Sequence, residues 1–113
     1  MVLLVDNDDL FRSALASNLR DDGYQVQEHA ATGSVPLQDL RDIDALLIDW
    51  AIERPKGRGF VKRFHEVYPS VPVIVITAVG KQSTERSAGH ITFLPKPLHY
   101  EALVETLVTA RPI

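Results

Sequence analysis

Residues 44–50 read DALLIDW, an apolar segment that carries a carboxylate near its end, directly before the only tryptophan of the chain. Five of its seven residues are apolar, which is typical of a strand covered on both faces. Asp49 then lies where this strand should end. The rest of the chain indicates why a charge is placed there.

Four other segments have the character of strands. They are residues 1–6 (MVLLVD), 24–29 (YQVQEH), 71–77 (VPVIVIT) and 91–97 (ITFLPKP). Polar and apolar residues alternate in the second of them, which predicts an edge strand with one solvent-facing side. The last is stopped by its prolines, because proline cannot donate a hydrogen bond to a neighbouring strand.

Helical patterns occupy the stretches between these strands. Apolar residues at helical spacing predict helices at 10–19, 60–68 and 98–108, with a short helix at 36–40 and a weak, polar one at 81–88. Asp8 or Asp9 can cap the start of the first helix, and Gly23 can close its end. Ser34 is expected to cap the short helix, with Pro36 in its first turn.

The alternation of five strands with five helices predicts an α/β fold. Crossovers between neighbouring strands are short and right-handed, which favours a parallel sheet with helices on both of its faces. A chain of 113 residues is long enough for one core and not for two. We therefore expect residues 1–113 to form a single domain.

Composition excludes several classes of function. The net charge is −3, with lysines and arginines scattered along the chain, which argues against direct nucleic-acid binding or attachment to an anionic membrane. No cysteine is present, so disulfides, cysteine-ligated zinc and thiol catalysis are excluded. No apolar run approaches the roughly 20 residues that cross a bilayer. The cytoplasm is the expected location.

Polar residues follow the predicted strands at the point where each one ends. In a parallel sheet all carboxyl ends lie along one edge, and ligands bind in the crevice there. The residues concerned are Asp6 with Asn7, Asp8 and Asp9 after the first strand, then Asp49, Thr77, and Lys96 before Pro97. The sequence therefore predicts that carboxylates, a hydroxyl and one ammonium group surround a single site.

This set of groups suits phosphoryl transfer. Crowded carboxylates repel one another, and a hard cation such as Mg²⁺ relieves that repulsion. A carboxylate beside Mg²⁺ can also attack phosphorus to form an acyl phosphate. Asp49 is the expected acceptor, with the metal, the Lys96 ammonium and the Thr77 hydroxyl to neutralise the phosphoryl oxygens.

Four motifs in this order resemble the receiver domain of two-component response regulators. They are VLLVDNDDLFR, DALLIDWAIERPKG, VPVIVITA and FLPKP, and the similarity covers essentially the whole chain. The resemblance implies a flavodoxin-like, doubly wound (βα)5 fold with strand order 2-1-3-4-5. It also implies that Asp49 is phosphorylated by a histidine kinase or a histidine phosphotransfer protein.

The resemblance further implies a role for individual residues. Asp6, Asn7, Asp49 and the backbone carbonyl of Ala51 would hold Mg²⁺. Lys96 would bind the phosphoryl group ahead of a cis peptide bond to Pro97, an isomer that is accessible mainly before proline. Thr77 and Phe93 would form the switch that responds to phosphorylation. Such a domain is a regulatory phosphoacceptor and not an enzyme, since it catalyses only its own phosphoryl transfer and dephosphorylation.

The sequence departs from the family pattern at three places. Asn7 replaces the second of two adjacent acids, which should lower Mg²⁺ affinity, although Asp8 could compensate in part. Ala51 and the two residues after it replace the usual turn that follows the acceptor. The step from Thr77 to Lys96 is 19 residues, about three fewer than the family pattern implies, so the fourth helix should be shortened. In the family, that helix belongs to the face that most receivers use for dimerising or for passing the signal on, so the resemblance allows a homodimer.

Two other functions fit parts of the sequence. A degenerate receiver would bind a partner without being phosphorylated, as Asn7 and the short fourth helix suggest. A phosphohydrolase of the haloacid dehalogenase type would use Asp6 as its nucleophile, because Asp6-Asn7-Asp8 satisfies the D-x-D pattern at the end of an apolar strand.

Overall fold

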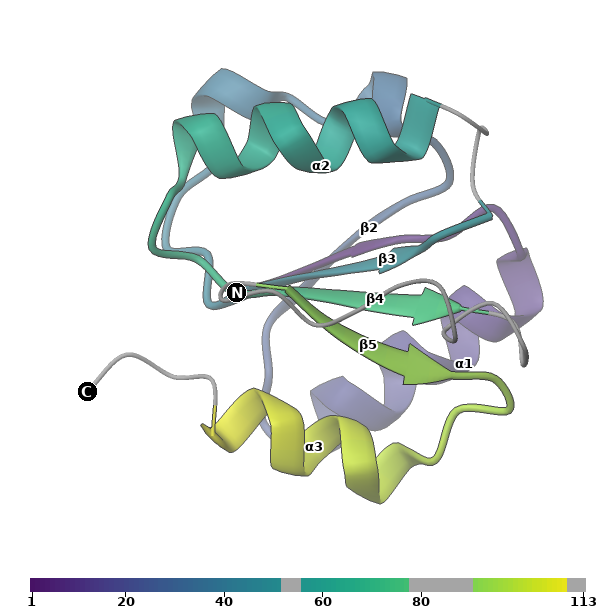
Figure 1. Ribbon diagram of the computed structural model, residues 1–113. Coiled ribbons are helices and arrows are strands. Elements are labelled where there is room, and N and C mark those ends of the chain that lie inside the picture. Colours follow the sequence, from purple (N-terminus) through teal and green to yellow (C-terminus); the bar gives the residue numbers. More distant parts are fainter. Residues whose placement is uncertain (52–55, 78–90, 110–113) are drawn as a thin grey trace.

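A computed structural model describes residues 1–51, 56–77 and 91–109 (Figure 1). Its centre is a five-stranded parallel sheet in the order β2-β1-β3-β4-β5. The strands are β1 (Val2–Val5), β2 (Val26–His29), β3 (Ala45–Asp49), β4 (Val73–Thr77) and β5 (Ile91–Pro95). Both the parallel sheet and the strand order agree with the prediction.

Burial of the strands follows their sequence patterns. Every residue of β1, β3 and β4 is buried, because these strands are central and their continuous apolar sequences are covered on both faces. β2 is half-buried along its whole length and lies at one edge, as its alternating sequence predicted. β5 forms the opposite edge.

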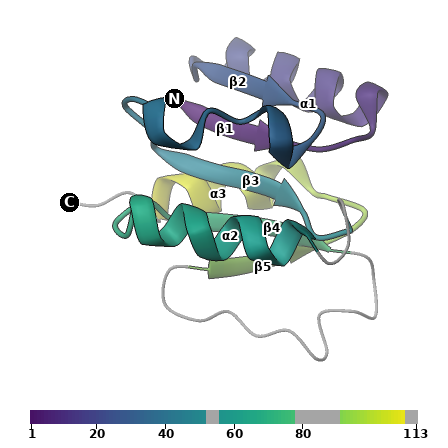
Figure 2. The same cartoon turned by 90° about the horizontal axis from the view of Figure 1, so that it is seen from above.

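Helices cover both faces of the sheet (Figures 1 and 2). α1 (Asp9–Asp21) and α3 (Tyr100–Thr109) lie on one face, and α2 (Lys56–Val67) lies on the other. Each face has its own apolar core. Leu4, Leu19 and Leu103 belong to the core beneath α1 and α3, and Leu46, Phe64 and Val75 belong to the one beneath α2. None of the described helices is long and apolar enough to cross a membrane.

The first helix begins and ends at the residues that the sequence indicated. Oδ1 of Asp8 accepts a hydrogen bond from the backbone N–H of Phe11 at 3.0 Å, which satisfies one of the free donors at the helix start. At the other end, Gly23 has a φ of +95°. Glycine adopts this conformation at little cost because it has no Cβ.

The connection from β2 to β3 contains the predicted short helix only in part, as a three-residue 3-10 helix. Residues 36–40 do not form an α-helix; they contain a single 3-10 turn, Leu37–Asp39, and a second one precedes it at Thr32–Ser34. A segment this short gains too few hydrogen bonds to offset helix nucleation. Ser34 was also expected to cap this helix, but its hydroxyl donates to the carbonyl of Ala31 instead. The helix predicted at 81–88 lies outside the described residues.

Candidate functional site

Asp49 ends the central strand β3, and both of its carboxylate oxygens accept a hydrogen bond. Lys96 Nζ lies 2.9 Å from Oδ2, and the backbone N–H of Ala51 donates to Oδ1 at 3.0 Å. The Asp49 side chain is 7% exposed and that of Lys96 is 37% exposed. The carboxylate is therefore held from two directions, at the side of the sheet where the carboxyl ends of the strands lie.

Asp6 follows β1, the strand next to β3, and is fully buried. Its Oδ1 accepts from the N–H of Asp8 at 2.8 Å, whereas Oδ2 is buried and has no hydrogen-bond partner among the described residues. Burial raises the pKa of the Asp6 carboxyl, and the negative charge of Asp49 raises it further, against the lowering effects of the Asp8 N–H and the Lys96 ammonium. A buried carboxylate oxygen without a partner is costly, and a bound cation would remove that cost.

The residues after Asp6 have separate tasks. Asp8 caps α1, and Asp9 forms an ion pair with Arg12 at 2.8 Å. Asn7 is exposed. Among the described residues, no three histidine, cysteine, aspartate or glutamate side chains gather as metal ligands. The acidic sequence DNDD therefore brings one carboxylate, that of Asp6, deep into the edge beside Asp49.

Thr77 and Lys96 meet at the ends of β4 and β5. Thr77 is buried, and its carbonyl accepts from the N–H of Lys96 at 2.7 Å. The peptide bond between Lys96 and Pro97 is cis. The Lys96 ammonium also lies 5.5 Å from the centre of the Phe11 ring on α1, so a cation–π contact accompanies its ion pair with Asp49.

Trp50 and Phe93 pack together beside this edge. Their ring centres are 5.7 Å apart and the rings are nearly perpendicular, an arrangement that aromatic quadrupoles favour. Trp50 is buried in the core beneath α2 and Phe93 packs against the same core, while the Arg58 guanidinium lies 4.8 Å from the centre of the Trp50 ring. Trp50, the residue after Asp49, therefore contacts Phe93, the aromatic residue expected to respond to phosphorylation.

One residue at this edge was not singled out from the sequence. Arg12 Nη1 donates to the backbone carbonyl of Asp6 at 2.7 Å. Its spacing in the sequence could have indicated part of this role. Arg12 lies three residues after Asp9, and side chains three residues apart on a helix can form an ion pair. That pattern predicts the pair with Asp9, but not the bond to Asp6.

Comparison with known proteins now identifies this arrangement. The sequence profile of the response regulator receiver domain matches residues 2–108. The chain belongs to the response regulator receiver domain family. Receiver domains are the regulatory phosphoacceptor modules of two-component systems and take part in phosphorelay. This assignment replaces the dehalogenase-type alternative.

Relatives of this receiver domain include regulators of several bacteria. The chain is 28% identical to a putative NtrX-like response regulator of Rickettsia conorii over 96% of its own length and 24% of the relative's. It is 31% identical to the transcriptional regulatory protein ZraR of Salmonella typhimurium, again over 96% of its own length and 26% of that protein's. The chain thus spans about a quarter of the length of these curated relatives.

Solved receiver structures share the fold. The receiver domain of NtrX from Brucella abortus superposes with a TM-score of 0.83 at 21% identity, over 97% of both chains. The receiver domain of the hybrid histidine kinase CckA superposes with a TM-score of 0.78 at 27% identity, over 96% of both chains. Together with the strand order, these likenesses establish a flavodoxin-like receiver fold.

Proposed function

We propose that this receiver domain accepts a phosphoryl group on Asp49 from a histidine kinase or a histidine phosphotransfer protein. The observation that supports it is the environment of Asp49. The carboxylate ends the central strand, Lys96 and the Ala51 N–H contact its two oxygens, and buried Asp6 adds a second carboxylate. An acceptor of phosphate requires a fixed nucleophile and a cation beside it, and this edge supplies both.

The transfer exchanges one bond at phosphorus for another. A carboxylate oxygen of Asp49 attacks the phosphorus of a phosphohistidine, a P–O bond forms, and the P–N bond breaks. The leaving imidazole nitrogen takes up a proton from water or from a group of the donor protein. The Lys96 ammonium compensates charge on the phosphoryl oxygens, and the Thr77 hydroxyl can donate a hydrogen bond to one of them.

The residues at this edge fit a Mg²⁺ ion. Asp6, Asn7, Asp49 and the backbone carbonyl of Ala51 would hold it. The buried Oδ2 of Asp6, to which no residue in the described part of the chain donates a hydrogen bond, suits an ion that prefers oxygen ligands. Bound there, Mg²⁺ would offset the repulsion of the carboxylates and part of the phosphoryl charge. Asn7 contributes a neutral oxygen, so this site carries one negative charge fewer than a pair of adjacent acids would.

Phosphorylation would be transmitted through Thr77 and Phe93. A phosphoryl group adds nearly two negative charges, and these attract the Thr77 hydroxyl and the Lys96 ammonium. Phe93 contacts Trp50, the residue after the acceptor. It also lies on β5, the strand that Lys96 directly follows. A shift of Thr77 would then bias the position of the Phe93 ring, since both strands end at the same edge.

Chemical phosphorylation tests this function. Acetyl phosphate with Mg²⁺ should add one phosphoryl group to the peptide that contains Asp49, as peptide mass spectrometry would detect. The Asp49→Asn variant should remain unmodified, and Asp6→Asn should react more slowly while its product still carries phosphate on Asp49. Modification of Asp6 itself would refute the assignment of the acceptor.

A degenerate receiver is the second candidate. It is favoured by Asn7, which supplies no negative charge to the proposed metal site, and by the 19-residue step from Thr77 to Lys96, which predicts a shortened fourth helix. Trp50 adjoins the proposed metal site, so its fluorescence should report binding. A saturable response to Mg²⁺, followed by a further response to beryllofluoride, supports the phosphoacceptor. No response to Mg²⁺ at the millimolar concentrations that weak sites require supports the degenerate receiver.

A further inference from the structure

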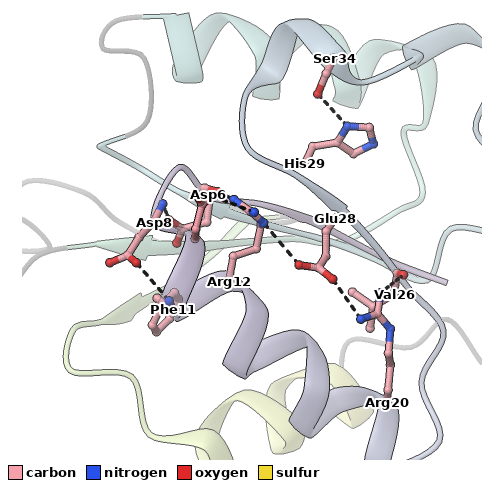
Figure 3. A network of polar contacts seen from close by, with 10 residues as sticks. Asp6, Asp8, Phe11, Arg12, Arg20, Val26, Glu28, His29 and Ser34 are labelled. Carbon is pink, nitrogen blue, oxygen red and sulfur yellow. Dashed lines mark hydrogen bonds and ion pairs between the residues drawn. The ribbon is translucent and has the colours of Figure 1, made fainter.

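Arg12 joins three elements at the end of β1. Its Nη1 donates to the carbonyl of Asp6 at 2.7 Å, its Nη2 lies 2.8 Å from Asp9 Oδ1, and its Nε lies 3.4 Å from Glu28 Oε1 on β2. The side chain is only 15% exposed. Figure 3 shows the guanidinium between the Asp6 turn and Glu28.

Glu28 extends this network to the far end of α1. Its second oxygen, Oε2, accepts from Arg20 Nη1 at 2.9 Å, and Arg20 Nη2 donates to the carbonyl of Val26 at 2.9 Å (Figure 3). One carboxylate on the edge strand therefore binds two arginines of the same helix. Only one of them, Arg12, also contacts the turn that carries the proposed ligands.

We propose that Arg12 is a positioning residue for the metal-binding turn at the end of β1. The inference rests on the proposed function, in which Asp6 and Asn7 are ligands. The Asp6 carbonyl belongs to the peptide unit that links these two residues, so a hydrogen bond to its oxygen fixes the orientation of that unit. On the other side of the turn, Asp6 Oδ1 accepts from the N–H of Asp8. The turn is thus held through its backbone as well as through its side chain.

Arginine suits this position for a geometric reason. Its planar guanidinium presents donors in several fixed directions, and here three of its nitrogens reach Asp6, Asp9 and Glu28. Lysine has a single charged nitrogen and cannot make all three contacts in the same geometry. Because Asn7 supplies no negative charge, the affinity of the site depends more heavily on ligands that are already in place.

Arg20 offers a matched control. It binds the same glutamate and also donates to a backbone carbonyl, but no contact joins it to Asp6, and its side chain is 48% exposed. Replacing either arginine with methionine removes one ion pair between α1 and β2 and retains an unbranched side chain. Only Arg12→Met also releases the Asp6 carbonyl.

The experiment is a Mg²⁺ titration of the whole chain followed by Trp50 fluorescence. Arg12→Met should weaken Mg²⁺ binding about tenfold or more, as the loss of a residue that orients a ligand does. Arg20→Met should change it by no more than about twofold, because an exposed ion pair contributes little. Arg12→Lys should recover only part of the affinity. Melting temperatures of all variants show whether they are equally folded.

Hydrogen exchange of the metal-free protein supplies a second readout. The Asp8 amide, which donates to Asp6 Oδ1, should exchange faster in Arg12→Met than in Arg20→Met. Equal Mg²⁺ affinities for these two variants would overturn the positioning role. If the unaltered chain binds no Mg²⁺, the metal part of the proposed function fails. The role of Arg12 is then tested by hydrogen exchange at the Asp8 amide alone, and an unchanged exchange rate in Arg12→Met rejects it.

Discussion

Lys96 Nζ lies 2.9 Å from Asp49 Oδ2, although the two residues are 47 positions apart in the chain. Asp49 ends β3 and Lys96 follows β5, so both lie at the carboxyl ends of parallel strands, with β4 between these two strands. The pair is unequal in burial, with Asp49 at 7% and Lys96 at 37% exposure. Lys96 is therefore accessible to solvent or to a ligand, whereas Asp49 is largely enclosed.

Lys96→Met should change metal binding and phosphorylation in opposite directions. The positive charge of the ammonium lies beside Asp49 and would repel a cation bound there, so its loss should tighten Mg²⁺ binding. Phosphorylation by acetyl phosphate should slow by roughly a hundredfold, because a charge that stabilises the transition state is gone. Trp50 fluorescence and phosphorylation rates measure the two effects. Lys62→Met, at an exposed position on α2, is the control, and a parallel loss of both activities in Lys96→Met would contradict this account.

Asp6→Asn should stabilise the metal-free protein at neutral pH. Burial raises the pKa of Asp6 in the folded state, so the folded protein binds this proton more tightly than the unfolded chain does. The stability of the unaltered protein should therefore increase as the pH falls through the raised pKa. The advantage of Asp6→Asn should shrink over the same interval. Urea unfolding across that range, without metal, measures it, and a difference that does not vary with pH counts against the prediction.

Tyr100→Phe should destabilise the contact between α1 and α3. The hydroxyl donates toward Asp22 Oδ2 at 2.6 Å and the carbonyl of Asn18 at 3.0 Å, and removing it should cost about 0.5–1.5 kcal/mol. Burial, followed by the bond to Asp22 and its charge, raises the pKa of Tyr100 to about 12. The folded state thus keeps a proton that the unfolded chain loses above the ordinary tyrosine pKa of 10.0. As the pH rises above 10.0, the free energy of unfolding of the unaltered protein should therefore approach that of Tyr100→Phe. Urea unfolding at neutral and alkaline pH would measure both values.

Phe64→Ala should be severely destabilising. Phe64 is a fully buried residue of α2, and its ring centre lies 5.2 Å from that of Tyr68. Its truncation leaves a cavity in a packed core and should cost about 3–5 kcal/mol. Val108→Ala is the matched control, because Val108 is 57% exposed on α3 and its change should stay within about 0.5 kcal/mol. Similar unfolding midpoints for the two variants would show that α2 contributes little to the core.

The central strands were predictable because their apolar sequences are continuous. Residues 44–50 and 71–77 could form little else in a chain of this length, and the alternating residues 24–29 indicated an edge before any pairing was known. Residues 36–40 were assigned to a helix on the strength of Pro36 and Ser34. Such local signals are weak in so short a segment, and tertiary contacts decided its form: Tyr68, the residue directly after α2, donates from its hydroxyl to the carbonyl of Leu37 at 2.6 Å.

The sequence by itself determined which strand ends carry polar groups, because a parallel sheet places all of those ends along one edge whatever their separation in the chain. It left the tasks of Asp8 and Asp9 open, since either could cap the first helix and Asp8 could also compensate for the missing charge at Asn7. The tertiary structure assigned them: Asp8 caps α1, Asp9 pairs with Arg12, and only Asp6 is buried beside Asp49. The physical reason is that α1 packs against β2, and the position of Arg12 between them depends on contacts far apart in sequence.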